Sequence, residues 1–212
     1  MPRVTLIDYG VGNILSVKRS LEYCGAIVTV SADPEVVLSS SRLVLPGVGA
    51  FHKGMAELVK RELVAPIQQV ANSGKPVMGI CLGMQLLLSE SEEFGHTDGL
   101  DLIPGRVVAV PDCDIVGQQL KIPHIGWNAL VPCRSQSFKH PLLKYNNAGD
   151  AMYFVHSFMS MPDDPACRLV DCYYGGNAIA AIISLGNVIG CQFHPEKSGE
   201  AGLRLIRAFC TF

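Results

Sequence analysis

The chain has 212 residues, of which 49% are hydrophobic and 17% are charged, and its formal net charge is −2. This length is sufficient for one domain with a substantial core. Average soluble domains contain about 25% charged residues, so the excess of apolar residues predicts a sheet buried on both faces or a surface that another chain covers. Basic residues form no cluster, which argues against a nucleic-acid groove.

The sequence also bears on the cellular compartment. Its start does not resemble a secretion signal, and no run reaches 18 uninterrupted apolar residues, so we expect a cytosolic location. Eight cysteines are present, none in C-x-x-C spacing. In a cytosolic chain of this length we expect most of them to be small buried side chains and not a disulfide framework.

The first half alternates strand-like and helical segments. The apolar pattern predicts strands at 4–8, 26–30, 43–45 and 76–80, and helices at 13–24 and 55–71. This βαβ rhythm is typical of a doubly wound α/β fold with a mostly parallel sheet.

Beyond about residue 100 the segments become shorter and are separated by Pro, Gly and Asn. We predict strands at 105–110, 119–122 and 152–158, a hairpin within 177–193 that turns at Leu185-Gly186-Asn187, and a closing helix at 199–212. These strands would add antiparallel pairs to the parallel half. We expect a single domain that covers residues 1–212.

A nucleophile is indicated where a predicted strand runs into Gly79-Ile80-Cys81-Leu82-Gly83 and then a helix. This is the G-x-nucleophile-x-G pattern of a nucleophile elbow, with Cys81 as the nucleophile. Glycine is needed at both flanking positions, because any larger residue would place its side chain against neighbouring backbone in so tight a turn. A helix N-terminus favours the thiolate, and the Leu82 N–H would face an oxyanion on an attacked carbonyl.

A thiolate that carries out acyl transfer needs a base and a group that orients the base. His194 and Glu196 are two residues apart at the end of an apolar strand, so their side chains can emerge on one face. Ligand sites of doubly wound sheets lie at the carboxyl ends of strands, which places this pair near Cys81. The Pro46-Gly47-Val48-Gly49 segment ends another such strand and offers free backbone N–H groups for an anion.

Two other kinds of site are disfavoured. Gly10-Val11-Gly12 lacks the third glycine of a dinucleotide motif, because residue 15 is Leu. The histidines other than His194 show neither i, i+4 pairing nor a Cys partner at zinc-ligand spacing, so we expect neither a metal nor a cofactor.

Several segments together resemble the class I glutamine amidotransferases, and in particular the glutaminase subunits that serve imidazole glycerol phosphate synthesis. They are IDYGVGN (7–13), LPGVGAF (45–51), GICLGMQLL (79–87), PHIGWN (123–128), YFVHSF (153–158) and QFHPEKSG (192–199). The elbow and the His-Pro-Glu segment are common to the whole family, whereas PHIGWN and YFVHSF are the most discriminating.

The resemblance implies a role for particular residues. Cys81 would be the nucleophile, His194 the acid and base, and Glu196 the orienting group. The backbone of Val48 and Leu82 would form the oxyanion hole, and glutamine would bind at Gly49, Gln85, Glu93, Ser157 and Phe158. Relatives often carry Tyr at position 158, so the resemblance supports only a main-chain contact there.

The resemblance also implies a partner. Ammonia released into water is protonated and loses its nucleophilicity, and one α/β domain leaves no second domain for an acceptor. The implied acceptor is a (β/α)8-barrel cyclase of histidine biosynthesis, docked through Asn13, Trp127, Tyr153 and Lys197. A packed core position for Trp127 and a solvated cation for Lys197 are equally good interpretations. We also expect the lone subunit to be nearly inactive until the Pro46 to Gly49 peptides turn to complete the oxyanion hole.

Two alternative functions keep the same fold. One is an amidotransferase subunit of a different pathway, and the other is a cysteine hydrolase that acts without a partner.

Overall fold

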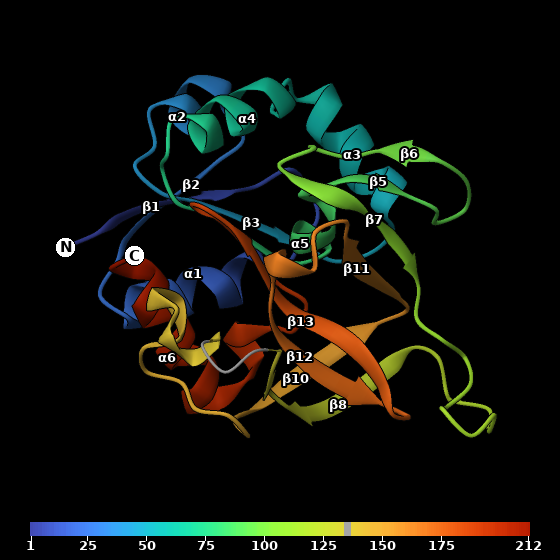
Figure 1. Ribbon diagram of the computed structural model, residues 1–212. Coiled ribbons are helices and arrows are strands. Elements are labelled where there is room, and N and C mark those ends of the chain that lie inside the picture. The colour runs from blue at the N-terminus through green and yellow to red at the C-terminus, as the bar shows by residue number, and fades with distance from the viewer. Residues whose placement is uncertain (134–136) are drawn as a thin grey trace.

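A computed structural model describes residues 1–133 and 137–212, and its central feature is an eight-stranded sheet (Figure 1). The strand order is β2 (Ile27–Ser31), β1 (Arg3–Ile7), β3 (Leu43–Gly47), β4 (Val77–Cys81), β14 (Val188–Cys191), β13 (Asn177–Leu185), β12 (Arg168–Tyr174) and β9 (Val131–Pro132). The strands from β2 to β14 pair in parallel, and the last three add antiparallel pairs. The predicted fold class is confirmed.

Helices cover both faces of the parallel half (Figure 1). On one face lie α2 (Pro34–Leu38), α3 (Phe51–Lys60) and α4 (Val64–Asn72), and on the other lie α1 (Ile14–Tyr23) and α6 (Gly199–Cys210). Each face has its own cluster of buried apolar residues, one including Val17 and Phe209 and the other including Leu58 and Ile67. The sheet therefore accounts for much of the apolar excess.

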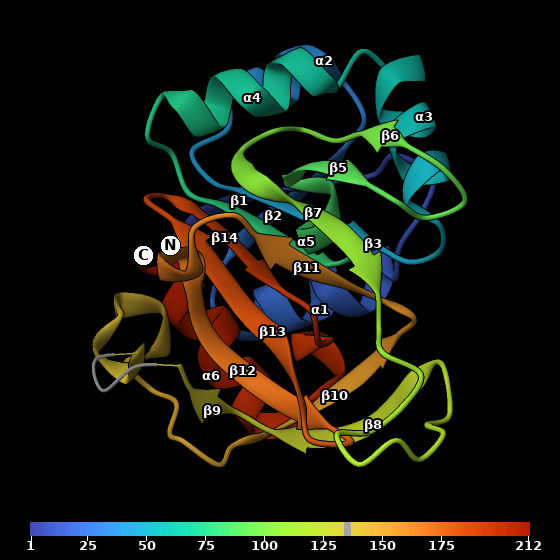
Figure 2. The same cartoon turned by 45° about the vertical axis from the view of Figure 1, so that its right-hand side comes forward.

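Two smaller sheets extend the fold beyond the parallel half (Figure 2). One has the order β11 (Phe158–Pro162), β7 (Ile103–Ala109), β5 (Leu88–Ser91) and β6 (Thr97–Asp98). The other is an antiparallel ribbon of β8 (His124–Ala129) and β10 (Ala151–His156). The short helix α5 (Leu82–Leu86) and four 3-10 helices complete the described secondary structure; the 3-10 helices are Ser137–Lys139, Pro141–Leu143, Pro165–Cys167 and Pro195–Lys197.

The single helix predicted at 55–71 is wrong, because the structure has two helices there. Between α3 and α4 the backbone of Glu62 takes a left-handed φ of 57°. Pro66 explains the break: it has no N–H to donate to the carbonyl of Glu62, and its ring would clash with that carbonyl in a continuous helix. Pro66 is accommodated in the first turn of α4 instead.

The strand predicted at 119–122 is also wrong, since only Gln119 forms a bridge, to Cys113. Asp114 accepts hydrogen bonds from the N–H groups of Val116 and Gln118, which folds this segment into a turn. The strand predicted at 152–158 ends at His156, and after Ser157 the chain enters β11 in a different sheet.

The other predicted elements are present, with the hairpin turning between β13 and β14 as expected. The pattern missed α2, β5, β6, β8, β9, β11 and β12, most of which are short or lie at an edge. Within the described residues, no helix has the length and apolar character needed to cross a membrane. The cytosolic location stays a prediction.

Candidate active site

The carboxyl ends of three neighbouring strands bring the predicted site segments together. Gly47 at the end of β3 pairs with Cys81 at the end of β4, and Cys191 of β14 pairs with Ile80. The chain after β3 continues into Val48 and Gly49, and the chain after β14 continues to His194. The sheet order therefore places the nucleophile between the glycine-rich segment and the histidine.

Cys81 has the strained backbone of a nucleophile elbow. It lies between β4 and the short helix α5 (Leu82–Leu86), with φ 55° and ψ −111°. A Cβ added at Gly79 would overlap the backbone of Gly83, and one added at Gly83 would overlap the carbonyl of Leu45. Both flanking glycines are thus required by close backbone approach, as the motif predicted.

His194 and Glu196 form a buried pair next to Cys81. The Nδ1 atom of His194 lies 2.8 Å from Oε1 of Glu196, and both side chains are almost fully buried. The backbone N–H of His194 also donates to the carbonyl of Tyr153 at 2.9 Å. The orientation of the imidazole is therefore fixed by its Nδ1 side, and Nε2 has no hydrogen-bond partner among the described residues.

The environment of His194 favours its protonated form. Burial by itself lowers the pKa of the imidazole, but its electrostatic interactions with the neighbouring Cys81 and Glu196 outweigh burial and raise the pKa to about 9. At neutral pH the side chain is then an imidazolium that faces a sulfur nucleophile.

One cavity of about 420 Å³ collects most of the predicted site. Its lining includes Cys81 and His194 with every residue predicted for the oxyanion hole and the glutamine pocket: Val48, Gly49, Leu82, Gln85, Glu93, Ser157 and Phe158. Glu196 lies behind His194 and does not line the cavity. The directions of the Val48 and Leu82 peptides, on which an oxyanion hole depends, stay a prediction.

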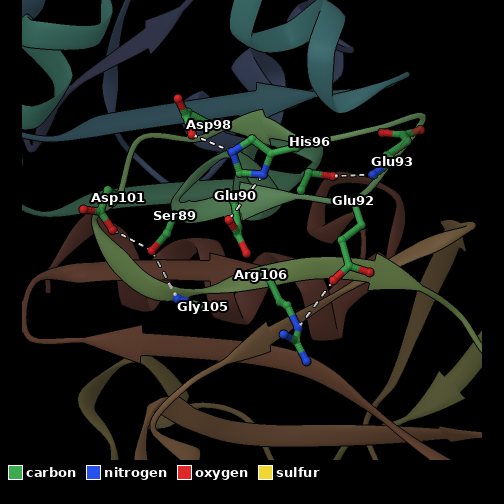
Figure 3. A network of polar contacts seen from close by, with 10 residues as sticks. Ser89, Glu90, Glu92, Glu93, His96, Asp98, Asp101, Gly105 and Arg106 are labelled. Carbon is green, nitrogen blue, oxygen red and sulfur yellow. Dashed lines mark hydrogen bonds and ion pairs between the residues drawn. The ribbon is translucent and has the colours of Figure 1, made fainter.

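Glu93 reaches the cavity from the turn between β5 and β6 (Figure 3). Its backbone N–H donates to Oγ of Ser91 at 3.1 Å, and its Oε2 accepts from the N–H of Phe51 at 2.6 Å. Phe51 begins α3, where a carboxylate satisfies an otherwise unpaired donor and the helix dipole. Around this turn, contacts of His96 with Glu90 and Asp98 and an ion pair of Arg106 with Glu92 link β5, β6 and β7 (Figure 3).

The pattern did not identify four residues of this site. Pro123, Val155 and His156 also line the cavity, and the fully buried Gln192 donates from Nε2 to Sγ of Cys81 at 3.8 Å. His124 and His156 are both buried and are hydrogen-bonded to each other. Their only sequence signal was membership in PHIGWN and YFVHSF.

Three of the four predicted docking residues form one surface group. Trp127 of β8 pairs with Tyr153 of β10, their rings meet edge to face at 5.9 Å, and Nζ of Lys197 lies 6.0 Å from the Tyr153 ring centre. Trp127 is 57% exposed, so it is not a packed core residue. Asn13 immediately precedes α1, and no described contact joins it to this group.

Comparison with known proteins places this geometry in a family. The model of "Glutamine amidotransferase class-I" matches residues 5–211. The chain is 53% identical to "Imidazole glycerol phosphate synthase subunit HisH 1" of Legionella pneumophila, over 99% of both chains. The chain belongs to the class I glutamine amidotransferases, in their HisH branch.

HisH proteins of other organisms are also similar to the chain over almost its full length. HisH of Geobacter sulfurreducens is 44% identical, over 99% of this chain and 98% of its own length. HisH of Methanosarcina mazei is 46% identical with the same coverage.

Among solved structures, a glutamine amidotransferase superposes with a TM-score of 0.72 at 16% identity, over 97% of this chain and 96% of its own. PurLQS of Thermotoga maritima also gives 0.72, at 18% identity, over 99% of this chain and 97% of its own. These two likenesses support the fold alone.

Proposed function

We propose that this chain is the glutaminase subunit of imidazole glycerol phosphate synthase. It hydrolyses glutamine to glutamate and ammonia, and passes the ammonia to a (β/α)8-barrel cyclase that forms imidazole glycerol phosphate and aminoimidazole carboxamide ribotide in histidine biosynthesis. The observation that carries the proposal is Cys81 at a strained elbow, beside a buried His194–Glu196 pair, on one cavity of a HisH-like chain.

The first half of the proposed reaction releases ammonia. The Cys81 thiolate attacks the side-chain amide carbon of glutamine, and the resulting oxyanion is held by the Val48 and Leu82 peptides. Collapse of this intermediate breaks the C–N bond, and the imidazolium of His194 supplies the proton that makes the leaving group neutral ammonia. A pKa of about 9 suits this step, because the proton is present at neutral pH and is held no more tightly than ammonia would hold it.

The second half regenerates the thiolate. Neutral His194 removes a proton from water, the hydroxide attacks the glutamyl thioester, and the C–S bond breaks to give glutamate. The proton stays on His194, so the resting ion pair is restored. Glu196 keeps Nδ1 protonated through its 2.8 Å contact and leaves Nε2 for the reacting groups.

The docking side of the proposal has its own support. The exposed group of Trp127, Tyr153 and Lys197 lies on and beside the β8–β10 ribbon, and the backbone of Tyr153 bonds to His194. A partner seated there would lie close to the site that releases ammonia. We further propose that docking completes the oxyanion hole by turning the Pro46 to Gly49 peptides, so that the lone chain is nearly inactive.

The test is reconstitution with the cyclase. The wild-type complex is expected to form product from glutamine or from ammonium salts. The Cys81→Ala complex is expected to lose glutamine-dependent synthesis and keep ammonia-dependent synthesis, because only the glutaminase step needs the sulfur. Loss of both activities would contradict the assignment of Cys81.

Two further outcomes separate the alternatives. Product formation only with the synthase of another pathway would identify a different amidotransferase, and rapid amide hydrolysis by the isolated chain would identify an independent cysteine hydrolase.

A further inference from the structure

The carbonyl oxygen of Phe158 is a meeting point of two hydrogen-bonded arms. It accepts from Nδ1 of His156 at 2.8 Å and from Nε2 of Gln85 at 2.9 Å. One arm runs outward to the β8–β10 ribbon, and the other runs inward to Cys81. Because a carbonyl can only accept, it fixes the direction of every hydrogen bond along both arms.

The outward arm contains two histidines in one defined tautomer. His156 carries its proton on Nδ1, so its Nε2 accepts from Nδ1 of His124 at 2.9 Å. His124 then has an unprotonated Nε2, which accepts from the side-chain amide of Asn128 at 2.6 Å. Each nitrogen of both rings has one partner of the matching kind, and both rings are neutral.

The surroundings of the two rings also favour the neutral form. His124 lies between the rings of Phe154 and Tyr174, with centres at 5.3 and 4.3 Å, and His156 faces His124 and the cationic His194. Burial lowers the pKa of His124 to about 4. For His156, burial outweighs the raising effect of the hydrogen bond to the Phe158 carbonyl and, with smaller lowering contributions from His124 and His194, brings the pKa to about 4 as well.

The inward arm ends on the nucleophile. Nε2 of Gln85 donates its second hydrogen to Oε1 of Gln192 at 3.1 Å, which leaves Nε2 of Gln192 to donate to Sγ of Cys81. Gln192 is fully buried, and its backbone N–H is held by the carbonyl of Ala181 at 2.9 Å. The side-chain amides of Gln85 and Gln192 are thus both oriented by the requirement that Gln85 donates to the Phe158 carbonyl. Oε1 of Gln85 is left as the acceptor for a bound molecule.

We propose that Asn128, His124, His156 and Gln192 are positioning residues, which with Gln85 and the Phe158 carbonyl form one continuous hydrogen-bonded chain from the β8–β10 ribbon to the sulfur of Cys81. At the inward end, Nε2 of Gln192 is a fixed hydrogen-bond donor to the thiolate, and the side-chain amide of Gln85 is oriented to bind glutamine. The outward end begins next to Trp127, so a partner on the ribbon acts on the pocket through this chain. The inference deepens the proposed function and rests on it for the identity of the substrate.

A purely architectural role does not explain this choice of side chains. Buried amides and imidazoles cost desolvation energy that apolar side chains of similar volume would not, and they are tolerated only when every group is satisfied. Here satisfaction is complete only if all members keep a single orientation.

The first experiment measures the thiol itself. Rates of alkylation of Cys81 by iodoacetamide are followed across pH in the isolated full-length chain, with the Cys81 peptide quantified by mass spectrometry. Gln192→Met keeps the side-chain length without the amide, and it is expected to move the pH midpoint of alkylation up by about one unit, the worth of one hydrogen bond to a charged group. Gln68→Met is the matched control, because the amide of Gln68 donates to the carbonyl of Leu100, away from the cavity.

The same variants are then assayed in the complex with the cyclase. Gln192→Met is expected to lower kcat for glutamine about tenfold and to leave ammonia-dependent synthesis, which is the step of the cyclase, unchanged. Co-elution of the variant with the cyclase on size-exclusion chromatography checks that the variant folds and assembles. An alkylation midpoint equal to that of Gln68→Met would overturn the inward arm. This measurement needs neither glutamine nor a partner, so it stands even if the proposed substrate is wrong.

The second experiment begins with the wild-type chain. Nitrogen NMR of the wild-type chain at neutral pH is expected to show His124 and His156 both protonated at Nδ1 and unprotonated at Nε2. His124→Phe preserves the stacking between Phe154 and Tyr174 but removes the donor to Nε2 of His156. The variant is expected to loosen the orientation of the His156 ring and to raise KM for glutamine through Gln85. An Nε2 proton on either wild-type ring, or an unchanged KM in His124→Phe, would overturn the outward arm.

Discussion

The strained backbone of Cys81 shows how one residue depends on its neighbours. A non-glycine residue at φ 55° and ψ −111° costs on the order of 1–3 kcal/mol, and it persists only when the surroundings allow no alternative. Here the parallel pairing of β4 with β3 and β14, and the close packing of α5 on those strands, impose the turn. The strained residue is therefore the one whose sulfur must project beyond the end of the sheet.

The close approach of α5 to β3 gives the first prediction. Gly83→Ala is expected to lower the free energy of unfolding by about 3 kcal/mol or more, because its Cβ would overlap the carbonyl of Leu45. Gly54→Ala is the control: its Cβ would meet only the side-chain ends of Leu82 and Leu86 at 3.2–3.4 Å, and alanine favours the helix. Urea unfolding measures both, and equal effects would contradict the steric argument.

A second residue-scale prediction concerns Glu196. Glu196→Gln removes the charge that raises the pKa of His194 and weakens the hydrogen bond to Nδ1, so that pKa is expected to fall below about 9. Glutamine-dependent kcat in the complex is expected to fall on the order of 10²–10⁴-fold, because an amide can donate as well as accept and no longer selects the tautomer protonated at Nδ1. NMR titration of His194 and steady-state kinetics measure the two effects.

The control for this variant is Glu200→Gln, on the first turn of α6 and largely exposed. It is expected to change neither quantity. A Glu196→Gln enzyme with the wild-type pKa of His194 would show that the pair does not act as the geometry indicates.

At the scale of elements, the sequence identifies those whose pattern is local. The sequence identifies the buried strands around the elbow and the amphipathic helices α1 and α6. The periodicity of their apolar residues and the residues that begin and end them are sufficient to define these elements. The split between α3 and α4 was missed because apolar spacing runs through Pro66, whose chemistry forbids the helix to continue. Short edge strands such as β6 and β9 carry too few residues to show a period.

The residues of the site also fall into those that the sequence identifies and those that it does not. Cys81, His194 and Glu196 lie in compact motifs whose spacing reflects their chemistry. Gln192 gains its contact only because the sheet brings residues 85 and 192 together across 107 positions, and the His124–His156 contact spans 32. Such pairs depend on strand order and register, which periodicity alone does not give.

The junction of α3 and α4 yields the third prediction. Glu62 holds a left-handed conformation that glycine adopts without steric cost, so Glu62→Gly is expected to raise the free energy of unfolding by about 0.5–1 kcal/mol. Ala56→Gly, at an exposed site within α3, is expected to lower it by about 1 kcal/mol. Chemical denaturation of both variants tests the sign, and destabilisation by Glu62→Gly would contradict the expected relief of strain.

At the scale of the whole molecule, the excess of apolar residues has two structural explanations. One is the sheet covered by helices on both faces, and the other is an exposed aromatic surface. Trp127 and Ile125, 57% and 53% exposed, lie on β8 and face the same side as alternate residues of one strand. Such aromatic groups are typical anchors of protein interfaces.

The fourth prediction follows from this surface. Trp127→Ala is expected to raise the Kd of the complex with the cyclase at least about thirtyfold, as loss of a central anchor does. Leu185→Ala removes an exposed apolar side chain where β13 turns into β14, at the opposite end of the sheet from Cys81, and is expected to leave the Kd unchanged. Titration calorimetry gives both values, and a wild-type Kd for Trp127→Ala would place the docking face elsewhere.

The buried histidines set how stability depends on pH. His194 has a raised pKa, so its contribution is fully present below pH 6.5 and is lost as the pH rises through about 9. His124 and His156 have lowered pKa values, so their contribution is present above pH 6.5 and is lost as the pH falls toward 4, when the unfolded chain binds protons that the folded chain does not. The two opposite trends predict maximum stability near neutral pH.

The acid side of this profile gives the last prediction. Between pH 7 and pH 5 each of the two histidines is expected to remove about 2 kcal/mol from the free energy of unfolding, given a shift from 6.5 to about 4. His124→Phe lacks one of the two groups, so its loss over this range is expected to be about 2 kcal/mol smaller than that of the wild type, whatever its stability at pH 7. The exposed His96→Phe is the control and is expected to keep the full loss, and His140, whose pKa burial also lowers, is common to all three chains. Urea unfolding at the two pH values measures the difference, and an undiminished loss in His124→Phe would show that this ring accepts a proton in the folded state as readily as in the unfolded one.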